Sequence, residues 1–321
     1  MAGAFSVVLS LGPDPFEMER LHYIAAALAK VEGNNLLSLI ILDDCKPARE
    51  YESIATLLGH KKLQIYPSPR QLRGHHWRGG LATNYLFGFE AAFGSGSPEF
   101  IIMIDSDCLL LRSFAGGLSD QFRANANLGI IASGIKADPT GQPAPECTWR
   151  DHFFKWSRRL RFRRTPFPRL ETAFFSNNRT IRRLLLNAFS NGWHEVASPQ
   201  GGAFAVSASF YKAYVQHQLT GRHGLWLKTD LTYDLIFGLL CAAFDLQAID
   251  DNGPGGTFAI SYQRLPFPPE ELVRRGYAWV HSLKCNSVEE ERSLRNDLLH
   301  MGQLELPPVR QNEICRLTSR P

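Results

Sequence analysis

The sequence predicts an α/β fold with a doubly wound, mostly parallel sheet, and two observations carry this prediction. Apolar runs typical of strands alternate with segments of helical spacing through the first half of the chain. Pairs of aspartates follow two of the strand-like runs, at positions 43–44 and at positions 105 and 107. Because parallel strands present their carboxyl ends at one edge of the sheet, we expect these acids to line one crevice.

The elements of the first half follow from spacing and punctuation. Met18, Leu21, Ala25 and Leu28 recur at helical intervals, and Gly33 ends that helix. The run 81–93 is apolar on nearly all sides, which predicts a buried helix. In chain order, we expect a strand at 5–11, a helix at 18–28, a strand at 36–42, a helix at 51–58, a strand at 62–66, a helix at 81–93 and a strand at 100–104.

The second half is less regular. We expect strands at 129–133, 201–206 and 278–281, an apolar helix at 232–244 and a charged helix at 289–299. Thr229 or Asp230 is expected at the start of the apolar helix, since both residue types cap helix N-termini.

Composition excludes several classes of protein. Of 321 residues, 44% are hydrophobic and 21% charged, which is ordinary for a globular chain. No apolar run approaches the length of a membrane span, and the N-terminus lacks a basic leading region. The six cysteines are scattered without a C-x-x-C pair, which favours reduced thiols in a cytoplasmic protein. No glycine-rich dinucleotide motif and no P-loop is present.

Positive charge is concentrated in one segment. Residues 149–183 contain eleven Lys and Arg against two acids, whereas the whole chain carries only +4. Between Trp149 and Arg169, the apolar residues Phe153, Trp156 and Leu160 recur at helical spacing. Such a segment lies on an anionic membrane surface, binds an anionic acceptor such as a lipid diphosphate, or is a packed helix with solvated arginines. No nucleic-acid recognition module is visible, so nucleic acid is not an expected partner.

The strand at 100–104 runs directly into Asp105-Ser106-Asp107. In an extended chain, side chains alternate, so Asp105 and Asp107 are expected to point the same way. Two adjacent carboxylates repel each other, and a divalent cation removes that conflict; oxygen ligands suit Mg²⁺ or Mn²⁺. The alternative is a junction between strand and turn that carries two solvated acids.

Taken in order, four segments make the chain similar to the GT-A-fold nucleotide-sugar glycosyltransferases, and closest to their family 2. The resemblance covers about residues 4–250. In addition, His281-Ser282-Leu283-Lys284 resembles the H-x-x-K of several GT-A families. The four segments are Asp43-Asp44, Gly79-Gly80-Leu81-Ala82-Thr83-Asn84, the D-x-D motif at Asp105 and Asp107, and Lys228-Thr229-Asp230-Leu231, which follows Gly201-Gly202.

The resemblance implies a role for each motif. Asp43 or Asp44 contacts the nucleoside of the donor. Asp105 and Asp107, with His281, hold Mn²⁺ or Mg²⁺ on the diphosphate of the nucleotide sugar. Lys284 meets a phosphate, and Arg78 is a further candidate for the diphosphate.

Asp230 stands where the family carries the catalytic base that takes the proton of the acceptor hydroxyl, which implies an inverting displacement. Thr229 replaces the Glu found in many members; if Thr229 caps the helix, Asp230 is left free for the base role. Asp234, one turn later, is the fallback. The acceptor is a saccharide, a lipid-linked or a small molecule.

Three functions follow from these observations. The first is a metal-dependent glycosyltransferase, cytoplasmic and in contact with the membrane face if residues 149–169 bind it. The second is a sugar-phosphate nucleotidyltransferase, although the loop after the first strand lacks the basic residues that class uses. The third is a non-catalytic protein that binds membranes or polyanions. Residues 1–133 are expected to bind the nucleotide sugar and 134–285 the acceptor, while 286–321 form a C-terminal helix and tail.

Overall fold

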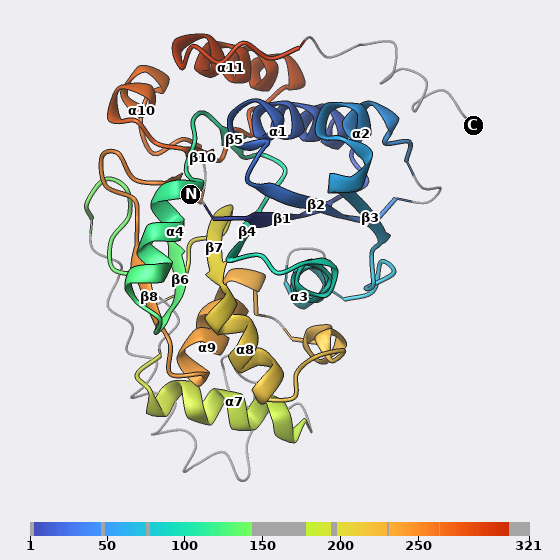
Figure 1. The fold of residues 1–321 in the computed structure, drawn as a ribbon, viewed down its shortest axis with the longest axis vertical. Helices are drawn as coiled ribbons and strands as arrows, with labels where there is room; N and C mark the ends of the chain where they lie inside the picture. Colours follow the sequence, from blue (N-terminus) through green and yellow to red (C-terminus); the bar gives the residue numbers. More distant parts are fainter. Residues whose placement is uncertain are drawn as a thin grey trace.

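A sheet of seven strands lies between two layers of helices in the computed structural model, which describes residues 3–45, 49–74, 78–142, 178–193, 198–229, 231–262 and 264–307 (Figure 1). The strand order is β3-β2-β1-β4-β7-β6-β8. β7 is antiparallel to β4 and β6, and all other pairs are parallel, so the predicted fold class is confirmed. The strands are β1 (Phe5–Leu11), β2 (Leu36–Asp43), β3 (Leu63–Pro67), β4 (Phe100–Ile104), β6 (Leu128–Ala132), β7 (Ala203–Ser207) and β8 (Gln247–Asp250).

Helices cover both faces of this sheet (Figure 1). α1 (Glu17–Glu32) and α2 (Glu52–Leu58) lie on one face. α3 (Gly79–Ser95), α8 (Ala208–Gln216) and α9 (Tyr233–Ala243) lie on the other, with α7 (Arg179–Ser190) packed beyond α9. Neighbouring residues of β4 belong to different apolar clusters, because Ile102 packs toward α1 and Ile101 toward α3 and α9. This explains why the strand is apolar throughout.

A second, smaller sheet adjoins the end of β4. It has the order β5-β10-β9, formed by β5 (Leu109–Leu110), β10 (Trp279–His281) and β9 (Phe258–Ile260). Only residues 105–108 separate β4 from β5, so the D-x-D motif is the junction between the two sheets. α4 (Ala115–Ala124), α10 (Pro269–Arg275) and α11 (Val288–Met301) complete the described helices, with short 3-10 turns at His60–Lys62 and His223–Trp226.

The predicted elements are present within a few residues of their expected bounds, with one error at a helix start. α9 begins at Tyr233 after Thr232, so the expectation that Thr229 caps it is wrong. The Thr229 hydroxyl instead donates to the carbonyl of Trp226, three residues earlier in the chain, at 2.8 Å. β5, β9, α4, α7, α8, β8 and α10 were not expected.

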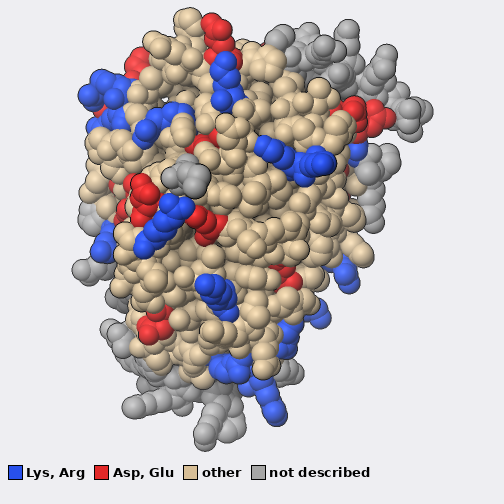
Figure 2. Space-filling model, in the orientation of Figure 1, with Lys and Arg blue, Asp and Glu red and all other residues tan. Residues whose placement is uncertain are grey.

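Two of the predicted features fall outside the described residues, namely the basic segment 149–169 and Asp230. No helix in the described part of the chain is long and apolar enough to span a membrane. On the face drawn in Figure 2, basic and acidic side chains are mixed over most of the surface.

Two leucines of β2 test how the core supports the fold. Leu39 is fully buried, whereas Leu37, two residues earlier, is 40% exposed. We expect Leu39→Ala to lower the free energy of unfolding by about 2–5 kcal/mol, because it leaves a cavity in the core. The matched Leu37→Ala change should cost about 1 kcal/mol or less. Urea unfolding measures both, and equal losses would contradict this description of the core.

Candidate functional site

Asp105, Asp107 and His281 converge at the junction of the two sheets. One ligand atom from each lies within 4.8 Å of the others. His281 Nε2 is 3.3 Å from Asp107 Oδ1. Asp105 directly follows β4, while His281 is the last residue of β10, which the small sheet places beside the motif. His281 thus joins the cluster although it lies at least 174 positions after the two aspartates in the chain.

The backbone of the D-x-D motif is a turn, so the expectation of an extended chain with alternating side chains is wrong. Residues 106 and 107 form the turn, and the amide of Cys108 donates to the carbonyl of Asp105 at 3.2 Å. The chain must bend here because β5 leaves the large sheet and joins the small one. The two carboxylates converge through this turn, not through the pleat of a strand.

Hydrogen bonds to two other segments of the chain fix Asp105. The Tyr85 hydroxyl, from α3, donates to Asp105 Oδ1 at 2.7 Å. The amide of Asp105 donates to the carbonyl of Gly202 at 2.7 Å. Tyr85 also stacks on Tyr233 of α9, with ring centroids 4.3 Å apart. Tyr85 belongs to no sequence motif, although a tyrosine in an otherwise apolar buried helix is a signal that its hydroxyl has a partner.

Asp107 is held by the segment that follows β10. The Ser282 hydroxyl donates to Asp107 Oδ2 at 2.5 Å, and the amide of Leu283 donates to the Asp107 carbonyl at 3.1 Å. Lys284 Nζ lies 3.7 Å from Asp107 Oδ2, on a side chain that is largely exposed. All four residues of the H-x-x-K stretch therefore contact the motif, three through their side chains and Leu283 through its backbone amide.

The three groups shift one another's pKa. Burial by itself would raise the pKa of Asp107, but His281 and Lys284 hold it below its usual range. Burial and the charge of Asp107 raise the pKa of Asp105. Burial by itself would lower the pKa of His281, and Asp107 raises it above the ordinary value. The charge of each group therefore depends on the other two, and Asp107 is the one whose anionic form is favoured.

The donor set fits a divalent cation. Asp107 Oδ1 is buried and accepts no hydrogen bond from the described residues. His281 Nδ1 lies 2.9 Å from the carbonyl of Ser261, and a proton on Nδ1 that is donated to this carbonyl leaves Nε2 with its lone pair toward Asp107. Carboxylate oxygens with one imidazole suit Mn²⁺ or Mg²⁺. Asp105, Asp107 and His281 are the residues that would hold the ion.

Two consecutive glycines allow close packing around the cluster. Gly202 has a φ of +123°, and a Cβ there would lie 2.6 Å from Cγ of His281. A Cβ on Gly201 would lie 3.3 Å from Oδ2 of Asp234, which is in the first turn of α9. Burial raises the pKa of Asp234. The Asp234 carboxylate and the His281 imidazole therefore lie beside two consecutive residues of the chain.

The acids at the end of β2 are already engaged by the protein. Asp43 accepts hydrogen bonds from the Tyr51 hydroxyl at 2.8 Å and from Arg49 at 3.2 Å. Asp44 Oδ2 accepts from Arg70 Nε at 2.7 Å. Asp44 Oδ1 is buried and has no hydrogen-bond partner among the described residues. Of the two acids, Asp44 retains an acceptor for a ligand.

The remaining candidates are Arg78, which directly precedes α3, and Asp230, which lies outside the described residues.

A cavity of about 580 Å³ adjoins the cluster of Asp105, Asp107 and His281 through Ser282 and Lys284. Arg264 and Phe267 line it from the loop after β9. Lys284 is among the candidates expected from the sequence, whereas this loop carries no motif that would mark it.

The family model described as "Glycosyl transferase family 2" matches residues 18–187. This match and the mixed, mostly parallel sheet confirm the expected GT-A fold. None of the curated protein sequences compared with the chain matches it.

Solved glycosyltransferase structures are similar to the chain at low identity. Galactosyltransferase LgtC with donor and acceptor sugar analogues is 11% identical with a TM-score of 0.46, over 96% of this chain and 98% of that one. Core-mannan synthase A from Aspergillus fumigatus, in its Mn/GDP form, is 10% identical with a TM-score of 0.39, over 83% and 81%. GalNAc-T7 with UDP, GalNAc and Mn²⁺ is 13% identical with a TM-score of 0.41; 66% of this chain covers only 36% of it.

Gly202 provides a test of the packing around His281. We expect Gly202→Ala to weaken Mn²⁺ binding and to destabilise the protein by about 1–3 kcal/mol, because the methyl group meets the imidazole at a strained φ. The control is Gly117→Ala in α4, where a Cβ has no neighbour within 4 Å. Titration calorimetry with Mn²⁺ and thermal unfolding measure the two effects. Unchanged Mn²⁺ affinity in the Gly202 variant would contradict the assigned geometry.

Proposed function

The chain belongs to glycosyl transferase family 2 and is a glycosyltransferase, and we propose that it transfers a sugar from a nucleoside-diphosphate sugar to a hydroxyl or amine acceptor with the help of a divalent cation. The observation that carries the proposal is the convergence of Asp105, Asp107 and His281 within 4.8 Å around a buried carboxylate oxygen that accepts no hydrogen bond from the described residues.

The metal cluster and its neighbours would bind the diphosphate of the donor. When bound, Mn²⁺ or Mg²⁺ offsets the negative charge that develops on the departing nucleoside diphosphate. Lys284 adds a positive charge 3.7 Å from Asp107, on a side chain exposed enough to reach a phosphate. Arg78, at the start of α3, is a second cation for the same group.

The nucleoside would bind at the end of β2. Asp44 Oδ1 is a buried acceptor with no hydrogen-bond partner among the described residues, which suits an N–H of the nucleobase or a ribose hydroxyl. Arg70 orients this carboxylate from its other oxygen at 2.7 Å. Asp43 supports the loop through Tyr51 and Arg49 and is therefore a weaker candidate for direct contact.

The acceptor would be deprotonated by a carboxylate that follows the glycine pair. In an inverting displacement, the acceptor oxygen forms the new bond to the anomeric carbon while the bond to the diphosphate oxygen breaks, and the hydroxyl proton passes to the base. Asp230 is the first candidate by its place in the motif. Asp234 is the described alternative, since its carboxylate lies against Gly201 beside the cluster.

The acceptor itself is a saccharide, a lipid-linked molecule or another small molecule. The cavity beside Ser282 and Lys284 has room for such a group, and Lys284 and Arg264 favour one that carries a negative charge. Peripheral membrane contact through residues 149–169 and a cytoplasmic location are part of the same proposal.

Donor binding is tested by thermal unfolding with UDP, GDP, CDP, dTDP and ADP, each with and without Mn²⁺. A ligand at about 100 times its Kd stabilises the folded state by about 2.7 kcal/mol. We expect one diphosphate to raise the melting temperature only with Mn²⁺, and Asp107→Asn to abolish the rise. The control, Asp120→Asn, changes an exposed acid of α4 and should leave it intact. No rise with any diphosphate would contradict the donor site, and pyrophosphate release from a nucleoside triphosphate would favour a nucleotidyltransferase.

The substitutions Asp230→Asn and Asp234→Asn test which carboxylate is the catalytic base that takes the proton of the acceptor hydroxyl. Loss of the base should lower kcat by about 10²–10⁴-fold while the affinity for the diphosphate with Mn²⁺ changes little. The base acts as the carboxylate, so activity falls as pH drops through its pKa. If Asp234 is the base, burial moves this fall above the ordinary range of an aspartate. Two variants with wild-type kcat would contradict catalysis by either residue.

A further inference from the structure

A fully buried arginine lies against the turn that carries the metal ligands. Arg295, on α11, has 0% of its surface exposed. Its Nη1 donates to the carbonyl of Cys108 at 3.0 Å, and its Nη2 donates to the carbonyl of Ser106 at 3.4 Å. Both carbonyls belong to the turn of Asp105 and Asp107, so one guanidinium fixes two points of the turn's backbone.

A buried chain of charges supplies the counter-ions for this arginine. Glu291, one turn earlier on α11, accepts from Arg295 at 3.0 and 2.8 Å. The same carboxylate accepts from Arg20 of α1 at 2.8 and 2.6 Å, and Arg20 donates to Glu17 at 2.8 Å. All four side chains are less than 10% exposed. Two positive and two negative charges therefore alternate behind the turn.

Such a network is a costly way to stabilise a fold. Burying ion pairs gives little net stability compared with apolar packing, because each charge loses its hydration. α11 already packs through Leu298 and Leu299. The arrangement is better explained by what Arg295 contacts, namely carbonyl oxygens of a turn whose two carboxylates repel each other.

We propose that Arg295 is a positioning residue for the metal centre, and that Glu291 and Arg20 hold it in place. By fixing the carbonyls of Ser106 and Cys108, Arg295 keeps Asp105 and Asp107 converged before a cation binds. This inference rests on the proposed function. It also makes α11, which the sequence assigned to a C-terminal helix and tail, a part of the active centre.

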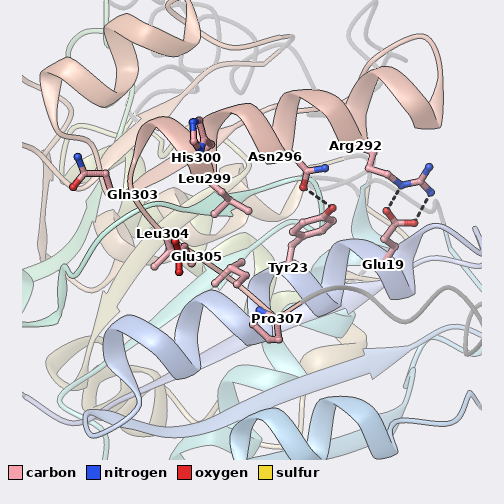
Figure 3. A pocket seen from close by; sticks show the side chains of 11 residues that line it. Glu19, Tyr23, Arg292, Asn296, Leu299, His300, Gln303, Leu304, Glu305 and Pro307 are labelled. Atoms are coloured by element: carbon pink, nitrogen blue, oxygen red, sulfur yellow. Dashed lines mark hydrogen bonds and ion pairs between the residues drawn. The ribbon is translucent and has the colours of Figure 1, made fainter.

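A second set of contacts between α1 and α11 provides a matched control. Arg292 pairs with Glu19 at 2.6 and 2.8 Å, and the Tyr23 hydroxyl donates to Asn296 at 3.0 Å. Figure 3 shows both contacts on the wall of a cavity of about 540 Å³ between the two helices. Neither contact touches the metal turn. Removing Arg292 loosens the same pair of helices without releasing that turn.

The test is the affinity for Mn²⁺ alone, measured from the electron paramagnetic resonance signal of free Mn²⁺, well below the melting temperature of each variant. The variants are Arg295→Met, Arg295→Lys and the charge-balanced pair Glu291→Gln with Arg295→Met. Loss of a group that orients metal ligands typically weakens metal binding by about 10–100-fold. We expect at least tenfold weaker binding in both Met variants, a smaller loss in Arg295→Lys, and wild-type affinity in Arg292→Met.

The outcomes separate this inference from the proposed function. If the wild type binds no Mn²⁺, or Asp107→Asn binds as tightly as the wild type, the proposed metal site itself is wrong. If Asp107→Asn loses Mn²⁺ while the folded Arg295 variants bind like the wild type, only the positioning role is overturned. Circular dichroism establishes which variants fold. Should the single Met variant not fold, the charge-balanced pair and Arg295→Lys decide, and equal weakening in Arg292→Met would reduce the role to general stability.

Discussion

Repulsion between two carboxylates at the end of a buried strand is the constraint on which the centre of this molecule depends. Asp105 and Asp107 stand where β4 leaves the large sheet, with their ligand atoms within 4.8 Å of each other and of His281. Like charges this close are unfavourable in a site with little water. The surrounding protein offsets the repulsion with donors and cations, and one buried oxygen of Asp107 accepts no hydrogen bond from the part of the chain that the structure describes.

The two sheets of the fold join at the D-x-D motif, and this junction brings other segments of the chain into contact with the two carboxylates. The turn at residues 105–108 sends the chain from β4 to β5, and the small sheet then places β10 alongside it. His281 arrives at the end of β10, and the next residue, Ser282, donates to Asp107. Gly202 directly precedes β7, and its lack of a side chain lets the imidazole approach its backbone. Arg295 contacts the turn through the main-chain carbonyls of Ser106 and Cys108.

Much of this architecture could be predicted from the sequence, because a strongly apolar strand or helix is recognisable from the residue pattern of its own segment. The regular strands of the first half and the motif residues follow from apolar runs and from the acids that end them. The sequence alone could not decide between an extended chain and a turn at Asp105, since whether a chain continues or bends after a strand depends on where a distant element, here β10, offers a partner. The role of α11 was hidden for a related reason. Glu291 and Arg295 look like solvated charges in a polar helix, and only tertiary packing shows that they are buried.

A crystal of the protein grown with Mn²⁺ and a nucleoside diphosphate, measured at a wavelength where manganese scatters anomalously, would show whether the junction of the two sheets binds a metal ion. We expect one anomalous peak bounded by Asp105, Asp107 and Nε2 of His281, beside the bound diphosphate and with Lys284 turned toward a phosphate. A peak elsewhere, or a diphosphate bound at this junction without any ion while His281 still pairs with Asp107, would contradict it.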